Sequence, residues 1–353
     1  MEHLSETRDT PMLGKPVLVV DPDRARACLL GGAIGDQLGY PEEFSTGPFD
    51  KQPPAVLPPY FSDDTQMTLF MAEGLVLSGT ELGGQADALL RWYKTQAQLR
   101  SIPVREYGDL IDLEALHAGR APGNTCMSAC GALLRHRMSQ GDELSPLARN
   151  DSAGCGAVMR AAPYGIACAS RRMAVQLACR AGQLTHGHVR GWLPAGFLAG
   201  AVWGLVRGED LGTALRCAEV LCAEEAGESD HPLLRVISTA IELGMSGDLK
   251  RLPKLGEGWV GDEALAFGVA GVCALYSSRE HPDPEQTARV LWALAAHKGD
   301  SDSTAAIGGN LIGAMLGQRG LPPKWIARVE LREVVEGLAD QLVEFTHLAS
   351  RPS

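Results

Sequence analysis

The sequence predicts an all-α fold, and three observations support this prediction. From Ser62 onward, segments with helical periodicity follow one another, and few segments alternate with the period of two that a half-buried strand shows. Alanine, leucine and arginine dominate these segments, whereas valine, isoleucine and aromatic residues are too sparse for the core of a sheet. No short-period repeat indicates a solenoid.

The chain is long enough for one large domain or two ordinary ones. Its 353 residues, of which 45% are hydrophobic and 21% charged, can bury a substantial core. Residues 1–22 are interpreted as an irregular N-terminal extension. The chemical motifs described below come from both ends of the remaining chain, so we expect residues 23–353 to form one compact domain.

The first helix is predicted over residues 24–39, with Asp23 as its N-cap. Prolines between positions 41 and 59 make the next stretch a long loop, because proline disfavours helix and sheet interiors. After the loop, further helices are predicted over 63–79, 84–100, 124–138, 156–170, 171–182, 189–207, 210–223, 232–245, 261–279, 284–298, 302–317 and 330–346.

Two helices carry rows of glycines four residues apart. One row is Gly31, Gly35 and Gly39, and the other is Gly309, Gly313 and Gly317. Glycine inside a helix costs about 1 kcal/mol relative to alanine, so such rows are useful where two backbones approach closely. We therefore expect these two helices to pack against each other near the centre of the core.

Charge and cysteine usage exclude some classes of function. The formal net charge of −11 argues against nucleic acid as a partner, because phosphate binding needs a basic surface. Nine cysteines without a C-x-x-C pair predict reduced, buried thiols in a cytoplasmic protein. No secretory signal and no membrane span are expected, because every apolar run is shorter than the roughly 20 residues that a span needs.

Carboxylates and hydroxyls cluster at two predicted helix starts. The first segment is Ser62-Asp63-Asp64-Thr65, and the second runs from Asp300 to Thr304. Each segment alone fits an ordinary N-cap, for which serine, threonine and aspartate are favoured. An EF-hand calcium loop is excluded for the second segment, because its sixth and twelfth positions hold Ala305 and Leu311 instead of glycine and glutamate.

A further carboxylate pair, Glu42-Glu43, follows the first glycine-rich helix. If the three segments met, their carboxylates would repel one another unless cations lay between them. Ligands that offer only oxygen select magnesium, manganese or calcium over zinc, and this number of carboxylates could hold two ions. The five carboxylates are Glu43, Asp63, Asp64, Asp300 and Asp302.

Four motifs together resemble the ADP-ribosylglycohydrolase family, which includes the dinitrogenase-reductase-activating glycohydrolase. They are G-A-I-G-D-x-L-G-x-x-x-E-F from Gly32 to Phe44, S-D-D-T-Q-M from Ser62, G-D-S-D-S from Gly299, and Leu184-Thr185-His186. They occur in family order between residue 23 and about residue 320. The resemblance implies a compact orthogonal bundle of helices with two magnesium ions at its centre, manganese being the alternative metal.

The resemblance also implies roles for particular residues. Glu43 would transfer a proton or gate the attacking water, and Asp302 is assigned to both catalysis and metal binding. The family more often has threonine where Ser62 and Ser303 stand, and serine keeps the ligating hydroxyl. The implied metal ligands are Ser62, Asp63, Asp64, Asp300, Asp302 and Ser303.

Two glycine-containing stretches resemble the ligand clamp of the family. Small residues before a helix leave backbone N–H groups free to hold phosphate oxygens, although a plain turn and cap would have the same composition. Cys155 stands where a small residue is wanted and is interpreted as packing, because no partner base is evident. The predicted substrate-binding residues are Gly123, Asn124, Ser152, Gly154, Cys155, Gly156 and His186.

The resemblance implies a metal-dependent hydrolase that removes ADP-ribose from a modified protein, with arginine as the first choice of linkage. Hydrolysis of serine-linked or small-molecule conjugates is one alternative. Another is a bacterial immunity-type protein that uses residues 1–22 to block an ADP-ribosylating toxin. A relative that keeps the fold without catalysis is disfavoured by the intact carboxylate set.

Overall fold

The computed structural model confirms the all-α prediction. It describes residues 19–49, 52–141, 147–227, 232–277 and 283–349. Within these ranges the only strand-like pairing is one isolated bridge between Gly154 and Val260. The predicted extension at residues 1–22 lies outside the described residues up to position 18, and α1 begins at Pro22.

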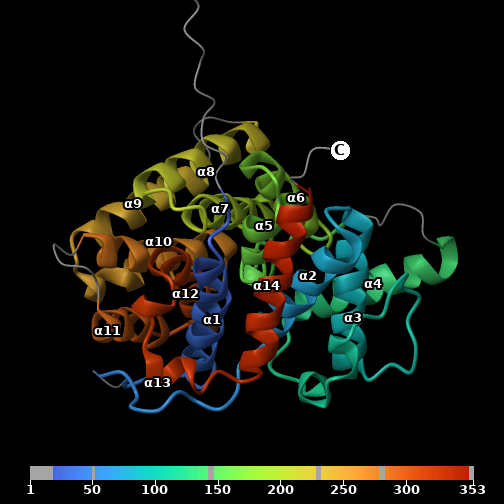
Figure 1. Ribbon diagram of the computed structural model, residues 1–353, viewed down its shortest axis with the longest axis horizontal. Helices are drawn as coiled ribbons and strands as arrows, with labels where there is room; N and C mark the ends of the chain where they lie inside the picture. The colour runs from blue at the N-terminus through green and yellow to red at the C-terminus, as the bar shows by residue number, and fades with distance from the viewer. Residues whose placement is uncertain (1–18, 50–51, 142–146, 228–231, 278–282, 350–353) are drawn as a thin grey trace, which may run out of the picture.

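Most helices follow one another with short connections, and longer segments precede α2, α4 and η3 (Figure 1). The longer ones are α1 Pro22–Gly39, α2 Asp63–Ser78, α3 Leu82–Ala97, α4 Asn124–Gln140, α6 Arg171–Gln183, α7 Val189–Leu205, α8 Leu211–Ala226, α9 Pro232–Met245, α10 Gly261–Tyr276, α11 Pro284–Ala295, α12 Ser301–Leu316 and α14 Arg332–Ala349. The short ones are α5 Ala162–Ala167, α13 Pro323–Ile326 and the 3₁₀ turns η1 Leu110–Asp112, η2 Glu114–His117, η3 Cys155–Ala157, η4 Leu249–Leu255 and η5 Gln318–Gly320.

The two glycine-bearing helices, α1 and α12, pack side by side in the middle of the molecule (Figure 1). A Cβ on Gly31 would lie 2.2 Å from the carbonyl oxygen of Gly309, and a Cβ on Gly35 would lie 2.0 Å from that of Ala305. At this separation only glycine fits between the backbones. The close approach predicted from the glycine rows is therefore confirmed.

Two details of these helices differ from the prediction. Gly317 ends α12 with a φ of 71° instead of continuing its packed face. The N-cap of α1 is Asp21, whose carboxylate accepts from the backbone N–H groups of Asp23 and Arg24. The prediction of Asp23 as the cap is wrong because Pro22 already has helical geometry at the first position. The Asp23 carboxylate instead accepts from the backbone of Gln318, after α12.

The helix predicted over 156–170 is also wrong in extent. The chain forms the single turn η3, and α5 begins only at Ala162. Pro163 lies in the first turn of α5, where its missing N–H is harmless. A continuous helix would place the proline ring against the carbonyl of Met159, so the helix has to restart at this point.

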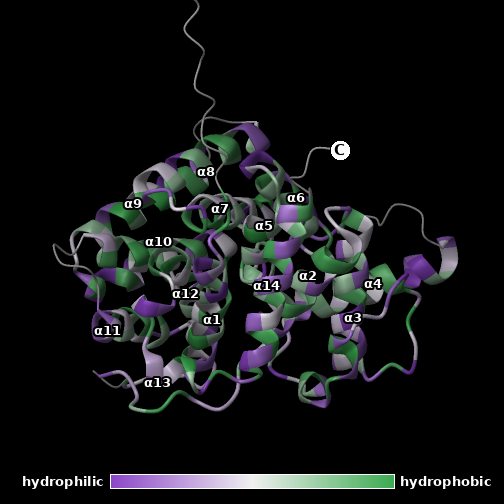
Figure 2. Ribbon diagram, in the orientation of Figure 1, coloured by the Kyte–Doolittle hydropathy of each residue, from purple (hydrophilic) through white to green (hydrophobic). Residues whose placement is uncertain are grey.

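The hydrophobic residues of α1, α7 and α10 are almost all buried. The outer helix α14 mixes hydrophilic and hydrophobic residues along its length, as expected for a helix with one face on the core (Figure 2). No helix in the described part of the chain is both long and apolar enough to cross a membrane.

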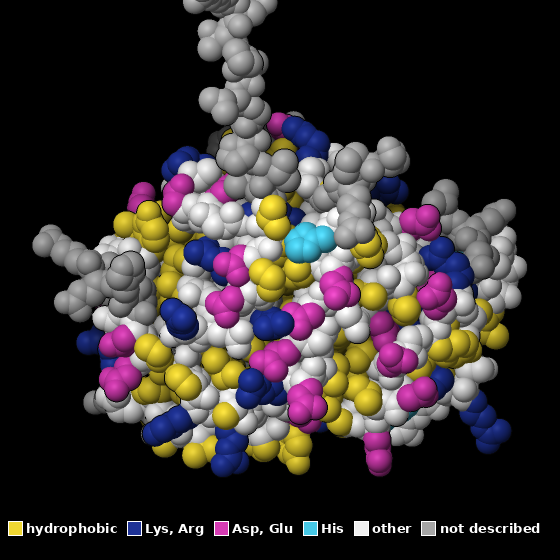
Figure 3. Space-filling view, in the orientation of Figure 1, with side chains coloured by type: hydrophobic (Ala, Val, Ile, Leu, Met, Phe, Trp, Pro, Cys, Tyr) yellow, Lys and Arg dark blue, Asp and Glu magenta, His cyan; other side chains and the backbone are white. Residues whose placement is uncertain are grey.

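Charged side chains of both signs are interspersed over the face seen in Figure 3. All nine cysteines are free thiols, as predicted from their number and spacing. Seven of them are buried, and Cys155 and Cys217 are partly buried. Of these two, Cys155 lies in the cavity described next.

Candidate active site

The start of α2 presents the first pair of predicted carboxylates. Ser62 is the N-cap, and its hydroxyl accepts from the backbone N–H of Asp64 at 3.2 Å. The fully buried Asp36 on α1 accepts from the backbone N–H of Ser62 at 2.7 Å and from that of Thr65 at 2.8 Å. Asp36 therefore fixes the helix start that carries Asp63 and Asp64.

The start of α12 presents the second pair. Asp300 is the N-cap and accepts from the backbone N–H of Ser303 at 3.3 Å. The backbone N–H of Asp300 donates to the carbonyl of Glu257 at 2.8 Å, which ties α12 to the segment before α10. Because α1 packs on α12 and also holds the start of α2, the two acidic helix starts meet.

The meeting point is a cavity of about 330 Å³. Most of the residues predicted for the site line it, although they come from positions far apart in the sequence. Ser62 and Ser152 are not among the lining residues: the Ser62 hydroxyl caps α2, and the Ser152 hydroxyl lies 2.9 Å from that of Thr125. The predicted residues that line the cavity are Glu43, Asp63, Asp64, Gly123, Asn124, Gly154, Cys155, Gly156, His186, Asp300, Asp302 and Ser303.

Several carboxyl groups of this cavity have pKa values well above their usual range. Burial, reinforced by the neighbouring carboxylates, raises the pKa of Asp63, Asp64 and Asp302 well above the usual value. Burial and the charges of Asp300 and Asp36 raise the pKa of Glu43 to about 8. The cluster therefore resists full ionisation as long as no positive charge enters it.

The part of the cavity wall formed by α4 and η3 offers backbone donors. The N-cap of α4 is Gly123, which has no side chain to cap the first N–H groups of the helix. Gly154 is the N-cap of η3 and Gly156 lies within it, and a Cβ on Gly156 would lie 2.7 Å from Cys126 Sγ and 3.1 Å from the ring of His186. An uncapped helix start beside a glycine-rich turn can hold an anion such as a phosphate.

His186 lies at the back of this wall and is 1% exposed. Burial, together with the positive charge of Arg160, lowers its pKa to about 3, so the imidazole is neutral at physiological pH. Its Nδ1 lies 2.8 Å from the hydroxyl of Thr185, which in turn accepts from Arg160 at 2.7 Å. This chain of contacts orients the ring toward Gly154 and Gly156.

Cys155 contacts the acidic cluster directly. Its thiol donates to Asp300 Oδ2 at 2.8 Å and accepts from the hydroxyl of Ser303 at 3.5 Å. Burial and the charge of Asp300 raise the pKa of this thiol well above its usual value. A protonated thiol is a poor nucleophile, which agrees with the interpretation of Cys155 as a packing residue.

The sequence reasoning missed two aromatic residues and one anchor. Phe44 and Trp259 line the cavity and stack on each other with ring centroids 5.5 Å apart. Their proximity is a tertiary contact across more than 200 residues, and no local pattern signals it. Asp36 was noticed only as part of a motif, although an aspartate inside an apolar helix is itself a signal of a buried partner.

The donor set of the cavity suits hard divalent cations. Carboxylate and hydroxyl oxygens predominate, and Asp64 Oδ2 and Glu43 Oε2 are buried without a hydrogen-bond donor. As the side chains stand, no three Asp, Glu, His or Cys groups among the described residues are arranged to hold one ion. Cation binding would therefore draw these carboxylates closer together while cancelling their repulsion.

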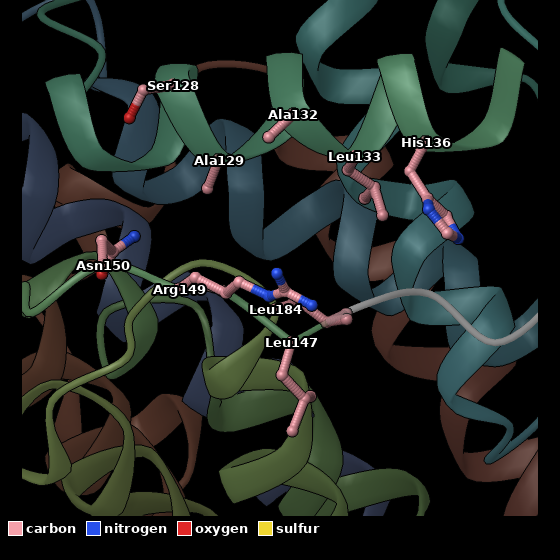
Figure 4. A pocket seen from close by; sticks show the side chains of 10 residues that line it. Ser128, Ala129, Ala132, Leu133, His136, Leu147, Arg149, Asn150 and Leu184 are labelled. Atoms are coloured by element: carbon pink, nitrogen blue, oxygen red, sulfur yellow. The ribbon is translucent and has the colours of Figure 1, made fainter. Parts of the chain in front are cut away.

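A larger cavity of about 510 Å³ lies between α4 and residues 147–150 (Figure 4). Leu133 lines it from α4 and Leu147 from the opposite side, and Leu184 and Arg149 also line it. The described residues that line it include no aspartate or glutamate and no glycine-rich helix start. The smaller acidic cavity is therefore the candidate active site.

Comparison with known proteins shows the family of the chain. The family model described as ADP-ribosylglycohydrolase matches residues 19–351, and membership of this family indicates a glycosidase-type hydrolase. The chain belongs to the ADP-ribosylglycohydrolase family. A solved structure described as an ADP-ribosylglycohydrolase-related protein complex superposes with a TM-score of 0.63 at 26% identity, covering 92% of this chain and 98% of the other.

Two bacterial relatives carry the name ADP-ribosylarginine hydrolase Tri1. The protein from Pseudomonas putida (strain GB-1) is 25% identical over 343 residues, which cover 91% of this chain and 78% of the relative. The protein from Serratia proteamaculans (strain 568) is 26% identical over 339 residues, covering 91% and 79%. Both alignments include the whole region that forms the acidic cavity.

Proposed function

We propose that this protein hydrolyses the N-glycosidic bond between ADP-ribose and an arginine side chain of a modified protein, with two bound magnesium ions. The observation that carries the proposal is the acidic cavity itself. Five carboxylates line it together with helix starts whose backbone donors suit a phosphate. The arginine linkage is supported by the name of the two bacterial relatives.

The proposed metal ligands are the carboxylates of Asp63, Asp64, Asp300 and Asp302 and the hydroxyls of Ser62 and Ser303. When bound, two magnesium ions would neutralise this cluster, hold the ribose hydroxyls and promote ionisation of a water molecule. Manganese would supply the same chemistry with the same ligands.

The remaining groups of the cavity bind and orient the substrate. The N–H groups in the first turn of α4 and the N–H of Gly156 in η3 would hold the diphosphate, and the neutral His186 would contact the ligand without adding charge. Glu43 lies on the loop after α1 and faces the same cavity as Asp300. From this position Glu43 would transfer a proton to the leaving guanidine or from the attacking water.

The experiment is release of ADP-ribose from an arginine-ADP-ribosylated protein, measured with magnesium, with manganese and with chelator. Asp302→Asn should abolish release, because it removes one charge of the cluster. Asp340→Asn is the matched control, since Asp340 forms a half-exposed ion pair with Arg26 on the outer face of α14. Such pairs contribute at most about 1 kcal/mol, so this variant should keep its activity.

Each outcome tests a different part of the proposal: the metal, the site, the linkage or the role of Glu43. Chelator-resistant release would refute the role of the metal, and release by Asp302→Asn at the rate of the wild type would refute the site. Release from a serine-linked substrate alone would replace the arginine linkage. Glu43→Gln should reduce the rate at least 100-fold if Glu43 moves a proton, and an unchanged rate would remove it from the mechanism.

A blocking function toward an ADP-ribosylating toxin is a second proposal and concerns residues 1–18, which lie outside the described residues. Deleting them should spare the fold, since the Asp21 cap and the buried Val20 remain. Hydrolysis should then survive, and any stoichiometric inhibition of a toxin should be lost. We place both functions in the cytoplasm, where nine free thiols stay reduced.

A further inference from the structure

The stacked pair Phe44–Trp259 at the mouth of the acidic cavity has no role in the chemistry described so far. The two rings lie 5.5 Å apart with an angle of 26° between their planes. Phe44 is 69% exposed and Trp259 is 37% exposed, although both line the cavity. Two large rings that face solvent beside a polar site lose the benefit of burial, so a binding role accounts for them better than packing does.

The backbone holds the Phe44 ring in place at some cost. Phe44 has a φ of 65°, in the left-handed region that a bulky residue rarely adopts. Trp259 follows Gly258, which has a φ of 84° and on which a Cβ would lie 2.6 Å from Thr304 Cγ2. The carbonyl of Trp259 accepts from the backbone N–H of Cys155 at 3.2 Å. Strain of this kind at a site mouth indicates a functional constraint.

The pair lies next to the groups that would act on the glycosidic bond. Phe44 directly follows Glu43 in the chain, and Trp259 is two residues from Glu257, whose carbonyl accepts from the Asp300 backbone N–H. Within the described ranges, no lysine or arginine lies over either ring, whereas Arg120 stacks on Tyr60 and Arg207 on Trp203 elsewhere. The rings are therefore open to a cation that comes from outside.

We propose that the Phe44–Trp259 pair, named here the aromatic platform, binds the guanidinium group of the modified arginine and so selects arginine as the leaving group. This inference rests on the proposed arginine linkage and adds the residues that recognise it. A guanidinium is a planar cation that stacks on aromatic faces, and both rings line the same cavity as Asp300. A serine leaving group has neither the plane nor the charge.

The position of the platform favours the guanidinium over the adenine ring of the same substrate. If the carboxylates hold the ribose that is cleaved, the leaving group lies at that ribose. The adenine lies a diphosphate and a second ribose away from it. Because Phe44 adjoins Glu43, the platform meets the leaving group first.

The test compares kcat/KM for one peptide carrying ADP-ribose on arginine with the Kd for free ADP-ribose. Phe44→Leu and Trp259→Leu keep apolar bulk and remove the aromatic face, whereas Phe44→Tyr and Trp259→Phe keep the face. Tyr276→Leu, at the far end of α10, is the control for loss of an exposed aromatic residue. Each leucine variant should lose about 10-fold in kcat/KM, the range of one cation–π contact.

The expected result is this loss with the affinity for ADP-ribose within 2-fold of wild type, while the variants that keep an aromatic face and the Tyr276 control remain active. An equal loss of affinity for ADP-ribose would overturn the proposal, since it would show adenine on the platform. Unchanged kcat/KM in both leucine variants would overturn it as well.

Failure of the arginine linkage itself is recognised separately, by a wild-type protein that does not cleave the arginine-linked peptide. Calorimetry with agmatine in the presence of ADP-ribose then tests the platform alone, with 1,4-diaminobutane as the non-planar cation. Agmatine binding that Phe44→Leu abolishes would support the platform. Equal binding of the two cations, or binding of neither, would refute it.

Discussion

Replacing Gly35 with alanine tests the contact on which both the fold and the acidic cavity depend. The new Cβ would lie 2.0 Å from the carbonyl oxygen of Ala305, and it must move at least 1.0 Å to reach the closest separation seen for real Cβ atoms. The Cβ is fixed to the backbone of α1 and the carbonyl belongs to the backbone of α12, so the two helices must separate. Overpacking of this kind costs about 3 kcal/mol, and the higher helix propensity of alanine returns about 1 kcal/mol.

The net loss of about 2 kcal/mol is measurable by thermal unfolding. With an unfolding entropy of about 2.1 cal/mol/K per residue, a chain of this length loses about 1.3 °C per kcal/mol, so Tm should fall by about 3 °C. Gly337→Ala in α14 is the matched control, because its Cβ would meet no atom within 4 Å, and its Tm should rise slightly. Equal Tm changes in the two variants would refute the close-packing argument.

Three further predictions concern an ion pair, a histidine and the metal. Glu330→Ala leaves the buried Arg120 unpaired and should lower Tm by about 4 °C, since breaking a buried pair costs about 3 kcal/mol; an unchanged Tm would contradict this. The folded pKa of His186, about 3, lies below the unfolded value of about 6.5, so its stabilisation is complete above pH 6.5 and is lost as pH falls toward 3. At pH 5 this loss is about 2 kcal/mol. Between pH 7 and pH 5 the Tm of wild type should therefore fall further than the Tm of His186→Asn. Parallel curves of Tm against pH would be evidence against the buried neutral ring. Magnesium at 100 times its Kd should raise Tm by about 4 °C in wild type and by less in Asp302→Asn, and a Tm indifferent to magnesium would count against the metal site.

The architecture was predictable where one local cause decides it. The glycine rows of α1 and α12 indicated their contact, because few uses other than close backbone approach compensate for glycine in a helix. The helix predicted over 156–170 was too long because Pro163 was given less weight than the surrounding alanines. Asp23 was predicted as the cap of α1, whereas Asp21 caps it, because Pro22 already takes the first helical position.

The membership of the acidic cavity was also largely predictable, whereas its exact lining was not. Motifs from both chain ends indicated the carboxylates, and the structure places them around one cavity. Ser152 does not line it, since its hydroxyl turns to Thr125 instead. The packing of helices that are distant in sequence decides which way the Ser152 hydroxyl points and brings Phe44 against Trp259. A single sequence does not encode such contacts in any local pattern.

The ambiguity between a helix cap and a metal ligand has a physical origin. Ser62 and Asp300 do cap α2 and α12, so the structural interpretation of each segment is correct. A cap needs a short side chain with an oxygen acceptor, and a magnesium ligand needs the same. What separates the two is convergence. A lone cap is stabilised by the helix dipole, whereas two acidic helix starts that share one buried cavity repel each other, and burial together with this repulsion raises the pKa of Asp64 and Asp302. Capping alone gives no reason for this arrangement, and cation binding does.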